Sequence, residues 1–337
     1  MSRLKLFDLE EERIKQEISR LGAKRVLVQL PQGLKNESLR IAKIVRKTGA
    51  LPIISADPCY GACDLAIDAA ESLDADLIIH YGHSRLLKYE KIPTVYIEAR
   101  AMLNVSEVVD KALSSIKDWS RLGLATTVQH VQILDEVKEI LVRAGKTVMI
   151  GDAGRMCYPG QVIGCDYSNA RSISKDVEAF LFICGGRFHA LGLALSVQKP
   201  VVVADPYEKR VYIIDENDVH KILNKRWACI QEAKAAKSFA IFVGLKPGQK
   251  RLEEALEISK KLENAGKETC LLAVREFNPD VIMEISSIDS YVNTACPRIS
   301  LDDSIRFKKP VITTNEARVV VGDLSWEDLC SSGWFGN

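Results

Sequence analysis

Short strand-like segments alternate with helical segments along the whole chain, and this alternation constrains the fold more than any other feature. In the first third, a helix is expected near 36–47. The strand-like runs of this third are VLVQL (26–30), PIIS (52–55), DLIIHYG (76–82) and TVYIEA (94–99). Alternating strands and helices are typical of βαβ units, in which helices cover a parallel sheet. We therefore expect an α/β fold.

The same pattern occurs three times along the chain. The second set comprises GLATTV (123–128), a helix near 132–144, TVMIGD (147–152), EAFLFICGG (178–186), PVVVAD (200–205) and a further run, VYIID (211–215). The third set comprises SFAIFVG (238–244), a helix near 249–264, ETCLLAV (268–274), SYVNTAC (290–296) and PVITTN (310–315). Because 337 residues exceed the size at which one core stops growing, we expect three small, similar α/β domains with parallel sheets. Their expected limits are 1–121, 122–237 and 238–337, with seams near 105–121 and 217–237.

Charge and cysteine content narrow the class of protein. Lys and Arg number 46 and Asp and Glu number 45, so a net charge of +1 gives no electrostatic reason to expect nucleic-acid or membrane binding. Charges throughout the first 25 residues, and the lack of 18 consecutive apolar residues, predict a cytoplasmic protein without signal peptide or spanning helix. Nine cysteines in a reducing compartment indicate buried thiols or metal ligands rather than a disulfide framework.

Three cysteines stand where the expected sheets would bind ligands. In doubly wound sheets, ligands bind in the loops beyond the carboxyl ends of the strands. Cys63 follows the second strand of the first unit, Cys165 follows the second strand of the second, and Cys296 closes the third strand of the third. Three others are interpreted as packing residues, namely Cys229, Cys270 and Cys330. One candidate ligand per unit remains.

Three thiolates from three loops permit two kinds of metal site. They could hold a zinc ion with an open position, or a four-iron cluster with one iron that lacks a protein ligand. The usual short-loop cluster motif CxxxCxxC, which would begin at Cys59, is excluded because Ala66 stands where its third cysteine would be. Spacing alone does not choose between zinc and a cluster assembled from distant loops.

Six motifs resemble, in order and spacing, the diphthamide-synthase family that begins diphthamide assembly on translation elongation factor 2. The most specific are YGAC followed about twenty residues later by HYGHS, and TACPR in the last unit. The full set is YGACD (60–64), HYGHS (80–84), GQVIGCDYSNA (160–170), GGRFHALG (185–192), DPY (205–207) and NTACPRISLDD (293–303). The resemblance therefore covers all three units.

The resemblance implies a radical enzyme with a [4Fe–4S] cluster at the centre of three α/β domains in pseudo-threefold arrangement. Carried over residue by residue, the ligands are Cys63, Cys165 and Cys296, and Cys59 is a non-ligand neighbour. The implied reaction moves the 3-amino-3-carboxypropyl group of S-adenosylmethionine to C2 of a histidine of elongation factor 2 and releases methylthioadenosine. The implied partners are elongation factor 2, an electron donor and a second copy of the chain in a homodimer.

Six further residues are predicted to line the S-adenosylmethionine pocket. His83 emerges from the strand of HYGHS, and Gly185 and Gly186 end a strand and allow close backbone approach to a ligand. His189 lies on the first turn of the following helix. Gln249 follows the first strand of the third unit, and Arg298 could pair with the methionine carboxylate.

Other interpretations of the three cysteines remain open from the residues alone. Quinolinate synthase also takes one cluster ligand from each of three α/β domains, and it uses the open iron as a Lewis acid for dehydration. A non-catalytic partner subunit of the same fold, or a zinc scaffold, would retain the same residues. Production of methylthioadenosine from S-adenosylmethionine separates these alternatives from the radical transferase.

Overall fold

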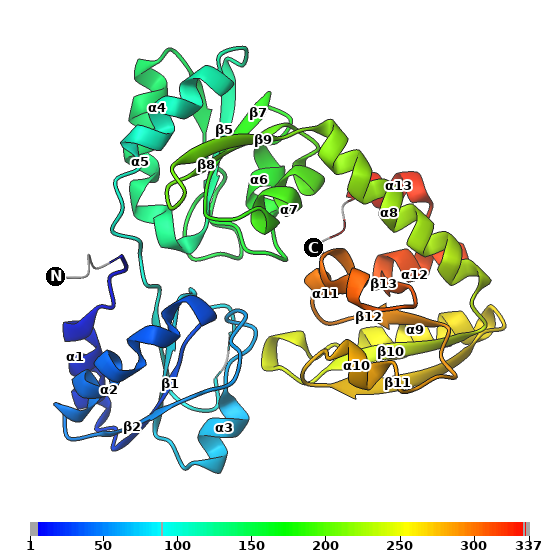
Figure 1. The fold of residues 1–337 in the computed structure, drawn as a ribbon, viewed down its shortest axis with the longest axis horizontal. Helices are drawn as coiled ribbons and strands as arrows, with labels where there is room; N and C mark the ends of the chain where they lie inside the picture. The colour runs from blue at the N-terminus through cyan, green and yellow to red at the C-terminus, as the bar shows by residue number, and fades with distance from the viewer. Residues whose placement is uncertain (1–5, 89, 333, 335–337) are drawn as a thin grey trace.

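The computed structural model describes residues 6–88, 90–332 and 334, and they form three lobes, each built on its own β-sheet (Figure 1). The first sheet has the strand order β2-β1-β3-β4, and the third has the equivalent order β11-β10-β12-β13. The second, β6-β5-β7-β8-β9, repeats this order and adds one strand. The predicted threefold repetition of one α/β unit is therefore confirmed.

The first lobe precedes residue 100. Its elements, with η marking a 3-10 helix, are α1 (Glu11–Leu21), β1 (Arg25–Gln29), η1 (Gln32–Glu37), α2 (Ser38–Arg46), β2 (Leu51–Ile54), α3 (Ile67–Ser72), β3 (Leu77–Tyr81) and β4 (Thr94–Ile97).

The second lobe follows directly. Its elements are α4 (Ser106–Ser115), β5 (Arg121–Thr126), η2 (Val128–Ile133), α5 (Leu134–Arg143), β6 (Thr147–Met149), α6 (Ser168–Ile173), β7 (Ala179–Ile183), α7 (Phe188–Val197), β8 (Val201–Asp205) and β9 (Arg210–Ile214).

A long helix, α8 (Glu216–Ala235), leads into the third lobe (Figure 1). The remaining elements are β10 (Ser238–Gly244), η3 (Pro247–Gln249), α9 (Leu252–Asn264), β11 (Glu268–Val274), α10 (Pro279–Ile282), β12 (Ser290–Asn293), α11 (Pro297–Leu301), η4 (Asp303–Arg306), β13 (Val311–Thr313), α12 (Thr314–Val321) and α13 (Trp326–Ser332).

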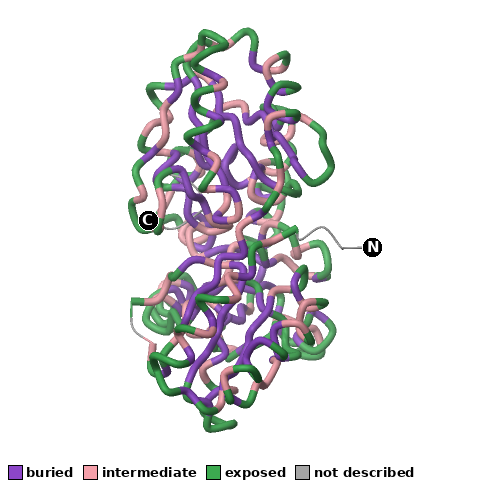
Figure 2. The backbone as a smooth tube through the Cα atoms, turned by 90° about the vertical axis from the view of Figure 1, so that its left-hand side faces the viewer, coloured by how far each residue is buried: buried purple, intermediate pink, exposed green. Residues whose placement is uncertain are grey.

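The central strands are buried on both faces, as parallel sheets between helices require. Every residue of β3, β7, β8 and β12 is buried. In β3, β7 and β8 most of these buried residues are Val, Ile, Leu and Phe, which fit the two-sided burial of a pleated strand, whereas β12 (SYVN) also buries Ser290 and Asn293. Figure 2 shows the buried stretches inside the lobes with exposed segments around them.

Strand β9 departs from the expected parallel pattern. It pairs antiparallel to β8, from Asp205 opposite Arg210 to Val201 opposite Ile214. Only residues 206–209 join the two strands, and a parallel crossover needs a dozen or more residues. The short connection therefore forces a hairpin.

Helix α4 packs on the second sheet although it precedes the first strand of that sheet. Its residues Val108, Val109 and Ala112 belong to one core cluster with Leu122 of β5 and Val202 of β8. The domain limits 1–121, 122–237 and 238–337 stay a prediction. Limits drawn from packing would move α4 into the second domain.

Candidate metal centre

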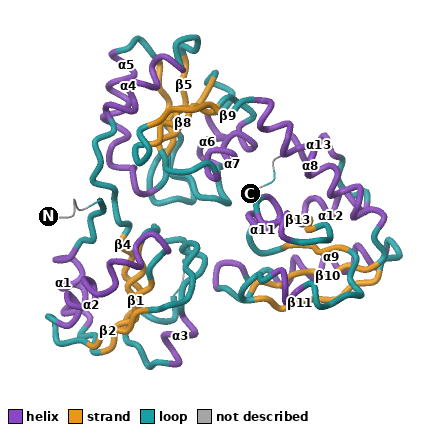
Figure 3. Tube along the Cα trace, viewed as in Figure 1, coloured by secondary structure: helices purple, strands orange, loops and turns teal. Residues whose placement is uncertain are grey.

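Each of the three predicted ligand cysteines lies in a loop beyond the carboxyl end of a strand. Cys63 stands between β2 and α3, and Cys165 stands between β6 and α6. Cys296 follows β12 and is the N-cap residue of α11. Two of the cysteines therefore follow the second strand of their lobe, and the third follows the third strand. Figure 3 shows loops of all three lobes facing the middle of the molecule.

The structure places these three thiols near enough to affect one another's ionisation. Burial raises the pKa of the Cys165 thiol to about 12, and the neighbouring Cys63 and Cys296 thiolates add to that increase. Burial likewise raises the pKa of Cys296 to about 11, again with a contribution from Cys63. All three are free cysteines. Buried thiols that repel one another as anions are stabilised when a cationic centre replaces their protons, so this donor set suits zinc or an iron–sulfur cluster.

The third lobe holds Cys63 of the first lobe directly. The backbone N–H of Gly248 donates to the Cys63 carbonyl at 2.8 Å, and the Gln249 side-chain amide donates to the Cys63 sulfur at 3.4 Å. A Cβ atom at Gly248 would lie 2.6 Å from Cys63 Cα, which leaves no room for a side chain. Gln249 was predicted to line the S-adenosylmethionine pocket, and here its amide nitrogen contacts a candidate ligand sulfur.

A buried lysine beside this contact was not predicted from the sequence. The Lys246 side chain is 4% exposed, and its amine lies 3.0 Å from the Asp64 carboxylate and 2.8 Å from that of Glu276. The amine also stands 4.3 Å from the centre of the Tyr60 ring. The sequence does mark this position, because the Pro-Gly pair of KPGQ predicts a turn directly after a buried strand, where ligand-binding residues often lie. Lys246 thus fixes the YGACD segment to the third lobe.

His83 extends from the end of β3 through a tight turn. Gly82 there has φ +81°, a left-handed conformation that glycine adopts without steric cost, and a Cβ atom would lie 2.8 Å from Pro31. The His83 Nδ1 atom lies 3.0 Å from Nε2 of the fully buried His80. Burial lowers the pKa of His83 to about 4, so its ring is neutral at physiological pH.

His189 and Arg298 meet His83 across the lobe boundary. Burial lowers the pKa of His189 to about 4, and the Arg298 charge and His83 contribute to that decrease. The Arg298 guanidinium stands 4.2 Å from the centre of the Phe188 ring, which joins the third lobe to the second. Arg298 also pairs with Asp302 at 3.4 Å, and its side chain is 47% exposed. A neutral imidazole and a partly free guanidinium therefore share one region with His83.

Packing within the second lobe explains Gly185, and backbone conformation explains Gly186. A Cβ atom at Gly185 would lie 2.7 Å from the Tyr207 ring, and Gly186 has φ +78°. The Gly186 N–H donates to Asp205 at 3.3 Å, and its carbonyl accepts from the Tyr212 hydroxyl at 3.1 Å. Their predicted contact with a ligand stays a prediction.

Cys59 lies near the candidate ligands. It is 7% exposed, burial raises its pKa to about 12, and the neighbouring Cys63 thiolate adds to that increase. Donor atoms of Cys59, His80 and His83 lie within 4.8 Å of one another. His80 Nε2 and His83 Nδ1 lie 3.0 Å apart, at hydrogen-bond distance. The sequence-based assignment of Cys59 as a non-ligand neighbour stays a prediction.

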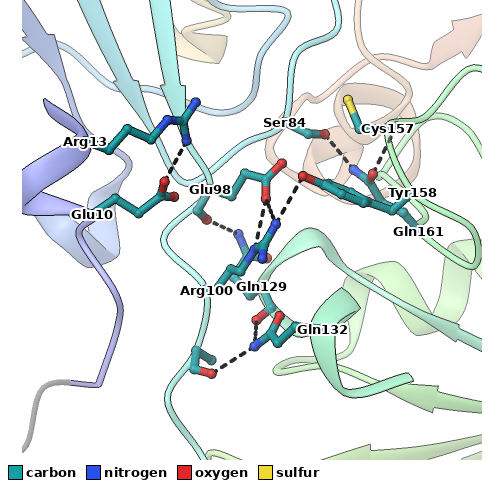
Figure 4. Close-up of polar contacts among 11 residues, drawn as sticks. Glu10, Arg13, Ser84, Glu98, Arg100, Gln129, Gln132, Cys157, Tyr158 and Gln161 are labelled. Atoms are coloured by element: carbon teal, nitrogen blue, oxygen red, sulfur yellow. Dashed lines mark hydrogen bonds and ion pairs between the residues drawn. The ribbon is translucent and has the colours of Figure 1, made fainter. Parts of the chain in front are cut away.

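Polar contacts also join the first lobe to the second beside the HYGHS segment (Figure 4). The Gln161 amide donates to the Ser84 hydroxyl at 2.6 Å, and the Gln129 amide donates to the Gly82 carbonyl at 2.7 Å. Arg100 donates to the Tyr158 hydroxyl at 3.2 Å. The first two contacts hold the loop that carries His83 at the residues on either side of it, Gly82 and Ser84.

Comparison with known proteins agrees with this arrangement. The family model for diphthamide synthesis proteins matches residues 30–330. The 2-(3-amino-3-carboxypropyl)histidine synthase of Pyrococcus horikoshii is 38% identical over 94% of this chain and 91% of its own length. The enzyme of the same name from Methanocaldococcus jannaschii is 30% identical, with 93% of this chain and 90% of the relative covered.

A solved structure extends the likeness to the fold. The crystal structure of Dph2 from Pyrococcus horikoshii with a 4Fe-4S cluster superposes with a TM-score of 0.87 at 36% identity, over 95% of this chain and 92% of that one. The predicted three-lobed α/β architecture is confirmed by this match. The protein is therefore a member of the diphthamide synthesis protein family.

Proposed function

We propose that this chain is a 2-(3-amino-3-carboxypropyl)histidine synthase. It transfers the 3-amino-3-carboxypropyl group of S-adenosylmethionine to C2 of a histidine imidazole in translation elongation factor 2, the first step of diphthamide biosynthesis. The observation that carries the proposal is the meeting of Cys63, Cys165 and Cys296 from three lobes. Relatives that bear this enzyme name match more than nine-tenths of the chain.

In this proposal the three cysteines hold a [4Fe–4S] cluster. Three protein ligands leave one iron free for S-adenosylmethionine. When bound, the cluster supplies the electron that breaks the bond between the sulfonium sulfur and the γ-carbon of the methionine part. All three cysteines are partly buried, and their loops come from three lobes, so the chain itself restricts the access of water to the site.

Residues next to the thiols suit the methionine part of S-adenosylmethionine. The exposed part of the Arg298 guanidinium can pair with a carboxylate, and stacking on Phe188 fixes its plane. The neutral His189 ring can accept a hydrogen bond from the amino group. Gln249 plays another part in this proposal, since its amide is directed to Cys63.

The proposal also names partners. Elongation factor 2 supplies the target histidine, an electron donor reduces the cluster, and the chain acts as a homodimer in the cytoplasm. None of the helices in the described part of the chain is long and apolar enough to cross a membrane.

Anaerobic purification followed by product analysis tests the proposed function. The protein should be brown, contain four irons, and release methylthioadenosine when dithionite and S-adenosylmethionine are added. Cys63→Ala, Cys165→Ala and Cys296→Ala should abolish this release, whereas Cys59→Ala should retain it. A colourless zinc protein would exclude the radical transfer, and a brown protein that leaves S-adenosylmethionine intact would favour a dehydratase or a partner subunit.

A further inference from the structure

A chain of side-chain hydrogen bonds connects Gln29 at the end of β1 to His83. Two backbone groups, one a donor and the other an acceptor, fix the orientation of the Gln29 side-chain amide. The Ala66 N–H donates to Gln29 Oε1 at 3.1 Å, and Gln29 Nε2 donates to the Asp64 carbonyl at 2.6 Å. A backbone N–H only donates and a carbonyl only accepts, so the orientation of the Gln29 amide follows.

The Gln29 amide in turn fixes the tautomers of two histidines. His80 Nδ1 lies 2.9 Å from Gln29 Oε1, and because that oxygen accepts, His80 Nδ1 carries the hydrogen. Burial keeps the pKa of His80 well below its usual value, so the ring is neutral and its Nε2 atom is an acceptor. His83 Nδ1, 3.0 Å away, must then donate.

The remaining nitrogen of His83 is therefore an acceptor. The His83 ring is neutral, Nδ1 carries its one hydrogen, and Nε2 keeps a lone pair. The Tyr81 carbonyl also approaches the ring, but it is an acceptor and donates nothing to Nε2. Among the described residues no hydrogen-bond donor to Nε2 is found, and His83 is only partly buried. His83 and Arg298 both lower the pKa of His189, so the three side chains lie in one region. A donor atom of His83 also lies within 4.8 Å of the Cys59 sulfur, and the Cys63 thiolate raises the pKa of Cys59.

We propose that His83 Nε2 accepts the proton that leaves C2 of the target imidazole, an inference that rests on the proposed function. The transfer breaks a C–H bond and a C–S bond and forms a C–C bond. In the overall balance, the electron pair of the C2–H bond ends in the new C–C bond. The pair of the C–S bond stays on sulfur as neutral methylthioadenosine leaves, and the C2 hydrogen leaves as a proton.

Gln29 and His80 are positioning residues in this proposal. They keep the single hydrogen of His83 on Nδ1 and so present a bare nitrogen to the substrate, as an orienting group does for a catalytic histidine. After proton uptake, the Nδ1–H of the charged His83 strengthens its hydrogen bond to His80, which stabilises the cation.

The test separates cleavage of S-adenosylmethionine from transfer. Wild-type protein, His83→Ala, Gln29→Met and the control His220→Gln, which alters an exposed histidine on α8, are loaded with the cluster anaerobically. Methylthioadenosine is measured without elongation factor 2. Transfer is then measured on elongation factor 2 that carries either hydrogen or deuterium at C2 of its histidines.

We expect His83→Ala to release methylthioadenosine within about twofold of wild type and to transfer the group roughly 10²-fold more slowly. Its deuterium isotope effect should exceed that of wild type, because loss of the C2 proton becomes rate-limiting. Gln29→Met should show the same signature more weakly, and His220→Gln should match wild type.

Three results would overturn the inference. They are unchanged transfer in His83→Ala, loss of methylthioadenosine release together with transfer, and slow transfer without an increased isotope effect. Failure of the proposed function is seen separately, because wild type would then form neither methylthioadenosine nor modified elongation factor 2.

Discussion

At the scale of single residues, the surroundings of Cys63 show how one side chain can adjust a metal centre. The Gln249 amide donates to the Cys63 sulfur at 3.4 Å, and this hydrogen bond opposes the increase in pKa that burial causes. A hydrogen bond to a ligand sulfur stabilises negative charge there. Reduction of a cluster adds negative charge, so the donor favours the reduced form.

Gln249→Leu should lower the midpoint potential of the cluster. Removal of the donor leaves the added charge of the reduced form less stabilised, and a tenfold change in the reduction equilibrium corresponds to about 59 mV for one electron. A redox titration followed by electron paramagnetic resonance measures the shift. Gln231→Leu, an exposed glutamine on α8, is the matched control, and equal potentials in the two variants would contradict the assigned role.

At the scale of elements, the short helix η3 acts as the contact between two lobes. Its Gly248 approaches Cys63 so closely that a Cβ atom would lie 2.6 Å from Cys63 Cα. The corresponding helix of the first lobe, η1, carries Gly33, where a Cβ atom would meet nothing within 4 Å. The two glycines therefore form a natural pair for comparison.

Gly248→Ala should displace the Cys63 loop and reduce cluster loading. Overpacking of this kind costs about 1–3 kcal/mol, and it acts here on a candidate ligand. Iron and acid-labile sulfide per chain give the loading, and Gly33→Ala should keep the wild-type value. Full loading of Gly248→Ala would show that the contact does not position Cys63.

A buried ion pair between α8 and α12 stabilises the third lobe. Arg226 Nε donates to Glu316 at 2.7 Å, and both side chains are at most 4% exposed. Arg226 also donates to the carbonyls of Ser300 and Val311, and Glu316 accepts from the N–H of Thr313 as part of a capping box. One pair thus connects both helices to the sheet edge.

Glu316→Gln should destabilise the protein by about 3–5 kcal/mol, because the buried Arg226 charge loses its counterion. Urea unfolding followed by tryptophan fluorescence measures the change, since Trp227 and Trp326 lie 5.0 Å apart beside these helices. The double variant Arg226→Met/Glu316→Gln should recover part of the loss. A loss below 1 kcal/mol in Glu316→Gln would contradict this account.

At the scale of the whole molecule, the first lobe meets the other two through polar contacts, whereas the second and third lobes also share an apolar cluster that includes Phe180 and Leu329. The first and third lobes meet at Lys246 and Asp64, the first and second at Gln161 and Ser84, and the second and third at Arg298. Polar contacts of this kind contribute little net stability compared with the apolar cores inside each lobe.

Removal of the cluster should therefore loosen the centre and leave the sheets intact. Binding at the junction stabilises only the state in which the three lobes meet. Amide hydrogen exchange should become faster at residues 58–66, 158–166, 246–249 and 294–298, while β3, β7 and β12 keep their protection. Equal acceleration in the sheet cores would show that the cluster stabilises the lobes themselves.

The sequence alone determined the number of lobes and the strand positions, and it placed Cys63, Cys165 and Cys296 in loops that follow strands; their role as ligands stays a prediction. These features depend on local periodicity and on which residues follow a strand, and both are properties of short segments. The helix near 132–144, for example, is α5, Leu134–Arg143. The strand β9 was predicted, but its antiparallel pairing was not, because strand direction in a sheet depends on the length of the connection and not on the residues of the strand.

Only the tertiary structure decided which side chains meet. The contact of the Gln249 amide with Cys63 was not expected, and Lys246 was not singled out at all, while the place of Gln249 in the substrate pocket stays a prediction. The acceptor nitrogen of His83 follows from a chain that begins at Gln29, more than fifty residues away. Contacts between lobes depend on how three separately folded sheets pack together. The periodicity of one segment predicts its secondary structure but not its partners in another lobe.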